Sequence, residues 1–283
     1  MAEITKALRE ELMQTAAALA DAARVETLAH FRAAGLEAEN KLSDSIGGAG
    51  ISDAGVSYVG GFDPVTCADR ASETRMREIL AVMRPDDAVL GEEFAPRAGT
   101  SGFTWVLDPI DGTRAYMSGA PTWGVLIAVN AGAGPVLGVI DQPYIGERFW
   151  GGLGRADMTG PLGACALATR KARPLGQAIL YSTFPEVGSA IEAEAFGQLA
   201  RQVQLTRYGG DCYAYALIAA GQIDLVVEAG LKAYDVQAPI AVIEAAGGIV
   251  TDWQGGPAYH GGRILAAANA SIHAEALAIL SKA

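Results

Sequence analysis

A short apolar run that breaks into a sharp turn, WVLDPIDGT at residues 105–113, limits the possible folds of this chain more than any other stretch. The apolar residues at its start are typical of a buried strand, and the proline, glycine and threonine at its end are typical of a turn. Asp108 and Asp111 stand where the strand breaks. Two carboxylates around a proline turn can converge on one point, which neighbours on a straight strand cannot do. The stretch therefore predicts a buried strand that delivers two acids to one place.

The two acids admit two interpretations. Converging carboxylate oxygens suit Mg²⁺, which binds few carboxylates and leaves coordination positions for water and substrate phosphate. Gly112 and Thr113 follow with backbone N–H groups, and Thr113 with a hydroxyl, that could receive an anion. Metal ligands and phosphate donors this close together favour a metal-dependent phosphatase. In the alternative, Asp108 and Asp111 only cap backbone groups of a surface turn.

Composition excludes several other classes of protein. With 51% hydrophobic residues, 19% charged residues and 35 glycines, the 283-residue chain is that of a compact, turn-rich globular protein, not a disordered one. Its net charge of −11 argues against nonspecific binding to nucleic acids and against docking on anionic membranes. A phosphate substrate would therefore have to be received locally, by metal ions or backbone donors.

The cysteines and the N-terminus favour a protein of the reducing cytoplasm. Cys67, Cys165 and Cys212 are few, widely spaced and odd in number, which predicts neither a disulfide framework nor a zinc site. We expect Cys67 and Cys212 to be small core residues. The N-terminus has acids and alanines where a signal or transit peptide would have other residues, and no apolar run reaches the length of a membrane span.

Alternating helix and strand patterns predict an α/β layered fold with two sheets. Helices are expected at about 4–31, after Asp69, and at 190–202, 212–220, 236–246 and 271–281. Strands are expected near 89–90, 105–107, 124–129, 136–140, 148–150, 179–183, 204–207, 223–227, 249–251 and 264–268. Residues 47–61 are expected to form a loop, or a hairpin with its turn at residues 60–61, and residues 151–174 are expected to form a loop. We expect one unit over 1–283, with two lobes at about 1–175 and 176–283.

Acidic residues recur where predicted strands end and predicted helices begin. Glu92 follows one short strand, Asp108 and Asp111 follow the next, and Asp235 opens a helix. Strand ends are where open α/β sheets assemble ligand sites, and helix N-termini tolerate carboxylates. Each acid alone could be a cap, but together they supply enough oxygens for two or three Mg²⁺ ions.

These motifs, in this order, resemble the inositol monophosphatase family of Mg²⁺-dependent, Li⁺-sensitive phosphatases. The resemblance rests on GEE at 91–93, WVLDPIDGT at 105–113 and YD at 234–235 ahead of EAAGG at 244–248, and it covers nearly the whole chain. Within the family the chain is most similar to the histidinol-phosphate phosphatases of histidine biosynthesis, through DGTR, GGDCYAY and VVEAGLK at 111–114, 209–215 and 226–232. The resemblance implies an αβαβα sandwich of the sugar-phosphatase type, a homodimer, and two or three Mg²⁺ per site that Mn²⁺ can replace.

The resemblance also implies a role for each matching position. Five positions match the family's metal ligands: Glu92, Asp108, the carbonyl of Ile110, Asp111 and Asp235. Gly112 and Thr113 would hold the phosphate, and Glu228 would contact the organic part of the substrate. Thr66 and Asp69 would orient a metal-bound water, although Asp69 could equally cap the helix that follows it. Glu92 and Thr113 would accept or steer the proton of that water.

Asp211 indicates the substrate, because inositol phosphatases tend to have a small neutral side chain at this position. With Gly210 and Glu228, a carboxylate here would suit the cationic amine of histidinol phosphate better than a polyol. The alternative is that Asp211 caps the helix beginning at Cys212. Inositol-1-phosphate is the main alternative substrate, followed by fructose-1,6-bisphosphate and nucleotide 3′-phosphates.

One departure from the family pattern favours a catalytically silent member that acts as a binding protein. The family usually has a lysine a few residues before the PVTxAD stretch, and residues 56–63 read VSYVGGFD, without a lysine. The absence of this lysine would change how the site completes the binding of a third metal ion. The presence of every metal carboxylate argues against the silent alternative, since clustered acids repel one another unless a cation is bound.

Overall fold

The computed structural model describes residues 4–34, 38–40 and 64–283. The predicted loop at 47–61 and the stretch without a lysine at 56–63 lie outside these residues. The α-helices of the described chain are α1 (Lys6–His30), α2 (Cys67–Met83), α3 (Thr113–Ser118), α4 (Ala190–Ala200), α5 (Asp211–Ala219), α6 (Ala233–Ala245) and α7 (Ala270–Leu280). None of the helices in this part of the chain is long and apolar enough to cross a membrane.

A seven-stranded sheet occupies the first half of the chain. Its strands, in spatial order, are β3 (Ala88–Gly91), β4 (Thr104–Asp111), β5 (Gly124–Asn130), β6 (Pro135–Gln142), β7 (Glu147–Gly152), β8 (Arg155–Gly160) and β9 (Gly163–Ala166). Strands β3 and β4 are parallel, and the other neighbours are antiparallel. The prediction of a loop at 151–174 is wrong, because β8 and β9 lie there. Strand β9 is exposed throughout and consists of small residues, so it lacks the apolar alternation that marks a strand.

A five-stranded sheet occupies the second half. Its order is β11 (Leu205–Tyr208), β10 (Ile179–Ser182), β12 (Leu225–Lys232), β14 (Gly261–Ala267) and β13 (Ile249–Thr251). Strand β10 is parallel to both neighbours, and β14 is antiparallel to both of its own. A short 3₁₀ helix (Leu175–Gln177) precedes this sheet, and β1 (Ala38–Asn40) and β2 (Pro64–Thr66) pair separately.

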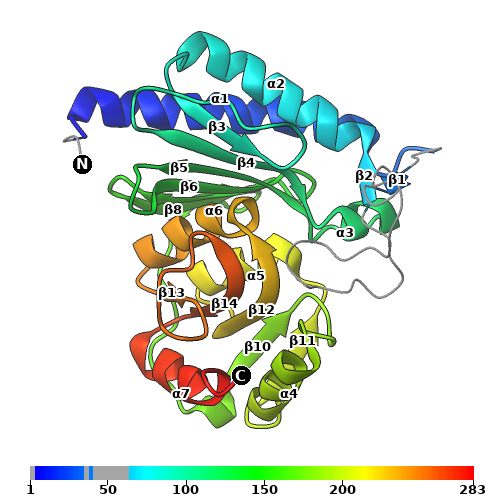
Figure 1. Cartoon of the computed structure of the whole chain (residues 1–283), viewed down its shortest axis with the longest axis vertical. Coiled ribbons are helices and arrows are strands. Elements are labelled where there is room, and N and C mark those ends of the chain that lie inside the picture. Colours follow the sequence, from blue (N-terminus) through cyan, green and yellow to red (C-terminus); the bar gives the residue numbers. More distant parts are fainter. Residues whose placement is uncertain (1–3, 35–37, 41–63) are drawn as a thin grey trace.

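The elements stack in five layers (Figure 1). Helices α1 and α2 cover the outer face of the seven-stranded sheet, α5 and α6 lie between the two sheets, and α4 and α7 cover the far face of the five-stranded sheet. Three hydrophobic clusters fill the spaces between these layers. The αβαβα order confirms the predicted fold class.

Helix α6 packs unusually close to the seven-stranded sheet, because two glycines face it. Gly138 and Gly151 are direct partners on β6 and β7. A Cβ at Gly138 would lie 2.4 Å from the carbonyl oxygen of Ala238, and one at Gly151 would lie 2.3 Å from that of Ala241. Backbone therefore meets backbone here, which fixes the position of α6 and of the residues in its first turn.

One of the smaller predictions concerns the burial of Cys67 and Cys212. Cys212 is buried as expected, but the prediction of a buried Cys67 is wrong, since Cys67 is exposed at the first position of α2. His273 is largely buried, and its Nε2 lies 2.8 Å from the hydroxyl of Thr251, which indicates a structural role.

Candidate active site

The end of β4 brings Asp108 and Asp111 to the same side of the strand through a bulge. Asp108 pairs with Leu126 on β5, whereas Asp111 pairs with Gly124, so β4 advances three residues while β5 moves back two. In a regular strand, side chains an odd number of residues apart point to opposite faces. The extra residue cancels this alternation. The strand thus continues through the predicted turn, and the bulge makes the two carboxylates converge.

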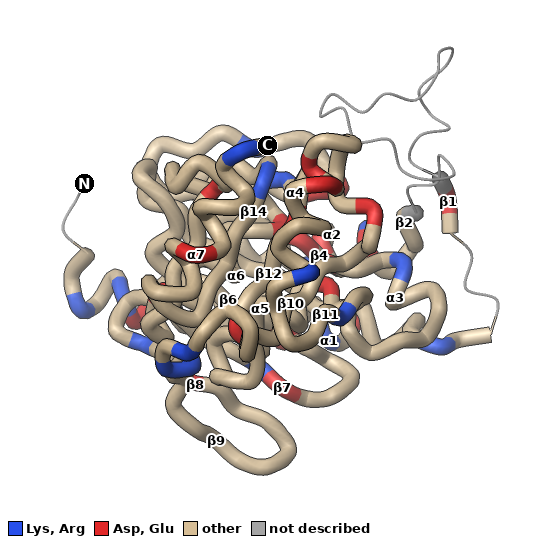
Figure 2. Tube along the Cα trace, turned by 90° about the horizontal axis from the view of Figure 1, so that it is seen from below, with Lys and Arg blue, Asp and Glu red and all other residues tan. Residues whose placement is uncertain are grey.

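Asp235 joins these two acids from a distant part of the chain. One carboxylate oxygen each from Asp108, Asp111 and Asp235 lies within 4.8 Å of the others. Asp235 is the third residue of α6, which begins directly after β12, and its Oδ2 accepts the backbone N–H of Lys232 at 2.7 Å. Figure 2 shows acidic segments of the trace gathered near the β4 label.

Glu92 lies beside Asp108 because β3 and β4 run parallel, with Gly91 opposite Leu107. The Glu92 and Asp108 carboxyl groups share a hydrogen bond. Glu73, which is fully buried on α2, holds the turn that carries Glu92. Its Oε2 accepts the N–H of Glu93 at 2.7 Å, and its Oε1 accepts Arg77 Nε at 2.7 Å. Sequence reasoning missed Glu73, because a glutamate on an amphipathic helix gives no local sign of burial.

The electrostatics of the cluster indicate a cation site. Burial raises the pKa of Asp108 well above its usual range, and the charges of Glu92, Asp111 and Asp235 raise it further. Burial also raises the pKa of Asp111, followed by the charges of Asp235 and Asp211. Such acids ionise together only when a positive charge is bound among them. Their hard oxygen donors fit a divalent cation such as Mg²⁺.

The backbone-capping interpretation of the two acids is also correct in part. Asp108 Oδ1 accepts the N–H of Ile110 at 3.0 Å, as expected for a turn. Asp111 Oδ2 accepts the N–H of Cys212 at 2.6 Å and so caps α5 from a distant part of the chain. Since a carboxylate has several acceptor positions, capping and metal binding do not exclude each other.

Gly112 and Thr113 lie at the N-terminus of the short helix α3. Gly112 has a φ of 86°, and a Cβ there would lie 2.8 Å from Cγ of Asp211, so both conformation and space require glycine. The Thr113 hydroxyl donates to the Ile110 carbonyl at 3.2 Å.

Thr66 and Asp69 form a capping box at the start of α2, with Asp69 Oδ2 accepting from the Thr66 N–H and hydroxyl at 2.8 and 2.6 Å. The capping interpretation of Asp69 is therefore confirmed. Strand β2, which ends at Thr66, contacts α3, the helix that Gly112 precedes. The role of Thr66 and Asp69 in orienting a metal-bound water remains a prediction.

Asp211 does not cap α5 by its own side chain. The cap residue is Gly210, without a side-chain cap, and Asp211 Oδ2 instead accepts the hydroxyl of Thr122 at 2.5 Å. Its backbone has a φ of 44°, which is rare outside glycine. Burial raises the pKa of Asp211, and the hydrogen bond from Thr122 opposes that rise. Thr122 was not predicted, because its pairing with Asp211 depends on the packing of distant segments.

Glu228 is buried on β12 and held by the end of β10. Its carboxylate accepts from the Thr183 N–H at 2.6 Å, the Thr183 hydroxyl at 2.9 Å and the Ser182 hydroxyl at 3.3 Å. Burial raises the pKa of Glu228 to about 7, although these hydrogen bonds oppose the rise. The charge of Asp211 raises the pKa of Glu228 further.

Glu228→Gln is expected to stabilise the protein at neutral and alkaline pH and much less at acid pH. The folded pKa of about 7 lies above the ordinary value of 4.5, so the stability this carboxyl contributes is present below pH 4.5 and lost as pH rises through 7. Above that pH the ionised form costs about 3 kcal/mol, which glutamine avoids. Urea unfolding near pH 8 and pH 5 measures this, with exposed Glu194→Gln as the control. An equal gain at both pH values would contradict the raised pKa.

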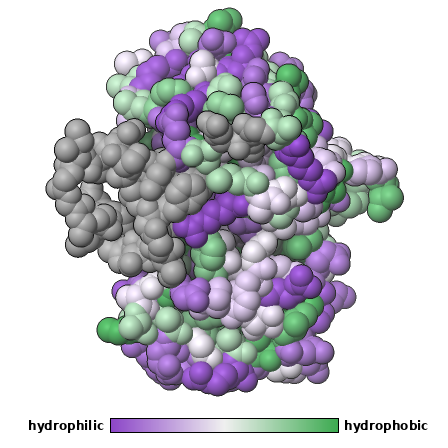
Figure 3. Space-filling model, turned by 90° about the vertical axis from the view of Figure 1, so that its right-hand side faces the viewer, coloured by the Kyte–Doolittle hydropathy of each residue, from purple (hydrophilic) through white to green (hydrophobic). Residues whose placement is uncertain are grey.

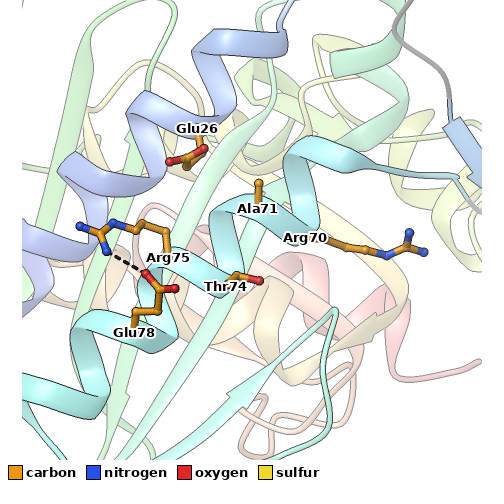
Figure 4. Close-up of a pocket in the computed structure, with 6 residues that line it drawn as sticks. All are labelled: Glu26, Arg70, Ala71, Thr74, Arg75 and Glu78. Carbon is orange, nitrogen blue, oxygen red and sulfur yellow. Dashed lines mark hydrogen bonds and ion pairs between the residues drawn. The ribbon is translucent and has the colours of Figure 1, made fainter.

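A separate groove of about 390 Å³ lies along α1 and α2 and contains none of the predicted site residues. Figure 4 shows the polar side chains that line it: Glu26, Arg70, Thr74, Arg75 and Glu78, with Ala71. Arg75 and Glu78 pair with each other at 2.7 Å. On the face drawn in Figure 3, hydrophilic residues also gather near the middle of the molecule.

Comparisons with known proteins agree on one family. The sequence model of the inositol monophosphatase family matches residues 10–283. A histidinol-phosphatase of Streptomyces coelicolor is 34% identical over 277 residues, covering 95% of this chain and 97% of that protein. The chloroplastic bifunctional phosphatase IMPL2 of Arabidopsis thaliana is 43% identical over 196 residues, which are 69% of this chain and only 56% of that protein. The solved structure of an inositol monophosphatase from Zymomonas mobilis has a TM-score of 0.79 at 34% identity, covering 96% of this chain and 98% of that one.

Proposed function

This chain belongs to the inositol monophosphatase family of metal-dependent phosphomonoesterases, and we propose that it is a Mg²⁺-dependent histidinol-phosphate phosphatase. The choice of substrate rests on the position of Asp211. Its carboxyl group lies against Gly112, at the proposed phosphate position. The negative charge of Asp211 also acts on a second buried carboxyl group, that of Glu228, whose pKa it raises. Two acids beside a phosphate position suit a substrate that carries a positive charge near its phosphate. Histidinol phosphate, with its amino group, is such a substrate.

In this proposal, the acids converging on the end of β4 hold the metal. Glu92, Asp108, the Ile110 carbonyl, Asp111 and Asp235 are the ligands. When bound, divalent cations lower the pKa of water and stabilise the leaving alkoxide. Side chains of the protein would then handle the proton and the water. Glu92 and Thr113 accept or steer the proton. Thr66 and Asp69 fix the position of the attacking water.

The N-terminus of α3 holds the phosphate in the same proposal. Gly112 and Thr113 present backbone N–H groups there, and such groups favour an anion. The absence of a Cβ at Gly112 is what allows Asp211 to approach this position. The phosphate and the ammonium group would thus be received side by side, one by backbone donors and the other by carboxylates.

Phosphate release from a panel of substrates tests the function. The panel contains histidinol phosphate, inositol-1-phosphate, fructose-1,6-bisphosphate and a 3′-phosphoadenosine nucleotide, each with Mg²⁺. We expect a strong preference for histidinol phosphate, loss of activity on chelation, and inhibition by millimolar Li⁺. Preference for inositol-1-phosphate would assign the chain to the activity named for the Zymomonas structure instead. No turnover of any substrate would support the silent alternative.

Asp211→Asn separates the charge of this residue from its packing. Asparagine can still accept the hydrogen bond from Thr122, so the fold should be kept. Loss of the charge is expected to lower kcat/KM for histidinol phosphate about 30-fold and to change that for inositol-1-phosphate much less, because a hydrogen bond to a charged partner is worth roughly 1.5–3 kcal/mol. Thr122→Val, which removes the hydroxyl but keeps the charge, is the matched comparison. Equal losses on both substrates would show that Asp211 does not select the amine.

A further inference from the structure

Tyr215 has a buried hydroxyl that no contact within the fold explains. The side chain lies on α5 and is 4% exposed, and its hydroxyl has no hydrogen-bond partner among the described residues. Buried polar groups of folded proteins are nearly always paired, and a phenylalanine would fill the same space without the unpaired group. An unpaired hydroxyl at such a position therefore points to a partner that arrives with a ligand.

The surroundings of this hydroxyl belong to the candidate active site. Tyr215 stands one helical turn after Asp211 on α5, and the carboxyl group of Asp211 lies against Gly112 and accepts the hydroxyl of Thr122. Asp111 caps the same helix by accepting the N–H of Cys212. The charges of Glu228, Asp111 and Asp235 all raise the pKa of Tyr215, which agrees with a position on this side of the site.

The hydroxyl is a hydrogen-bond donor under all ordinary conditions. Burial raises the pKa of Tyr215 well above its usual range, and the neighbouring carboxylates raise it further, so the phenol keeps its proton. In histidinol phosphate the ammonium group offers only donors, and it is matched by Asp211 and Glu228. The neutral imidazole ring still offers one nitrogen that can accept.

We propose that Tyr215 determines specificity by donating a hydrogen bond from its hydroxyl to the accepting ring nitrogen of a substrate that carries a neutral imidazole. This inference rests on the proposed function for the identity of the substrate. In the proposed function, two carboxylates recognise the amino group of the substrate. The inference adds Tyr215 as the residue that recognises the imidazole ring. The three groups together distinguish histidinol phosphate from a polyol phosphate, which has hydroxyls in place of both features.

Tyr215→Phe tests the proposal, with Tyr213→Phe as the matched control on the same helix. The hydroxyl of Tyr213 donates to Glu147 at 2.7 Å, so its loss should lower the melting temperature and leave substrate selectivity unchanged. Tyr215→Phe should not lower the melting temperature, because its hydroxyl has no partner within the described fold. It should lower the ratio of kcat/KM for histidinol phosphate to that for 4-nitrophenyl phosphate about tenfold, the usual effect of one neutral hydrogen bond.

Histidinol, as an inhibitor of 4-nitrophenyl phosphate hydrolysis, provides the second measurement. We expect its inhibition constant to rise in Tyr215→Phe by the same factor, while that of inorganic phosphate changes less. If the wild type hydrolyses histidinol phosphate and Tyr215→Phe keeps the wild-type ratio, the inference is wrong and the proposed function stands. A fall in melting temperature as large as that of Tyr213→Phe would also overturn it. If the wild type neither hydrolyses histidinol phosphate nor binds histidinol, the proposed function and the inference both fail.

Discussion

Asp111→Asn is expected to lower kcat about a thousandfold or more and, in the absence of divalent metal, to raise the melting temperature. The loss of activity follows because a metal ion stabilises the transition state by several kcal/mol and each 1.4 kcal/mol or so is a factor of about ten. The gain in stability follows because the raised pKa of Asp111 reflects burial and repulsion from Asp235 and Asp211. Asparagine removes one of these negative charges and can still accept the N–H of Cys212 through its amide oxygen.

Melting curves with a chelator and with Mg²⁺ separate the two effects. Wild-type protein should gain several degrees on addition of Mg²⁺, since a ligand that binds only the folded state stabilises it. The melting temperature of Asp111→Asn should be higher than that of the wild type in chelator and should rise little on addition of Mg²⁺. Asp252→Asn is the control, because Asp252 also accepts backbone N–H groups in a turn, from Gln254 and Gly256. Activity within tenfold of the wild type, or an equal response to Mg²⁺, would remove Asp111 from the metal site.

The acids of the site could be predicted because their signals are local. A strand that ends in a proline turn with two aspartates is visible in a few residues, and Glu92 and Asp235 stand at comparable ends. The bulge that makes Asp108 and Asp111 converge could not be predicted from the sequence. Asp108 and Asp111 face the same side only because β4 gains a residue relative to β5, and such a shift is a property of the pair of strands.

The supporting residues depend on contacts between distant segments, which a single sequence does not show. Glu73 holds the Glu92 turn from α2, Thr122 holds Asp211, and Thr183 holds Glu228. The interpretation of Asp211 as a cap failed for the same reason, since the carboxylate that caps α5 comes from Asp111. Strand β9 was missed because its pairing with β8 comes from the backbone, not from an apolar side-chain pattern.

Gly151→Ala is expected to destabilise the protein by about 3 kcal/mol or more, the upper range for overpacking a buried position. The added Cβ would lie 2.3 Å from both the Ala241 carbonyl oxygen and the Val242 Cα. These are backbone atoms of α6, so no side-chain rotation can relieve the contact, and either the helix or the sheet must move. Gly176→Ala is the control, because its added Cβ would meet no atom closer than 3.8 Å.

The same substitution should weaken metal binding, which links the packing of the sheet to the proposed chemistry. Asp235 stands in the first turn of α6, whereas Asp108 and Asp111 belong to the sheet against which α6 packs. A displaced helix therefore changes the distance between acids that must converge within a few ångströms to share a cation. Titration of Mg²⁺ against activity measures this, and Gly151→Ala should need more Mg²⁺ for half-maximal rate. If Gly151→Ala lost stability but kept the wild-type Mg²⁺ requirement, α6 would be able to adjust without moving Asp235, and the close approach at Gly138 and Gly151 would serve the fold alone.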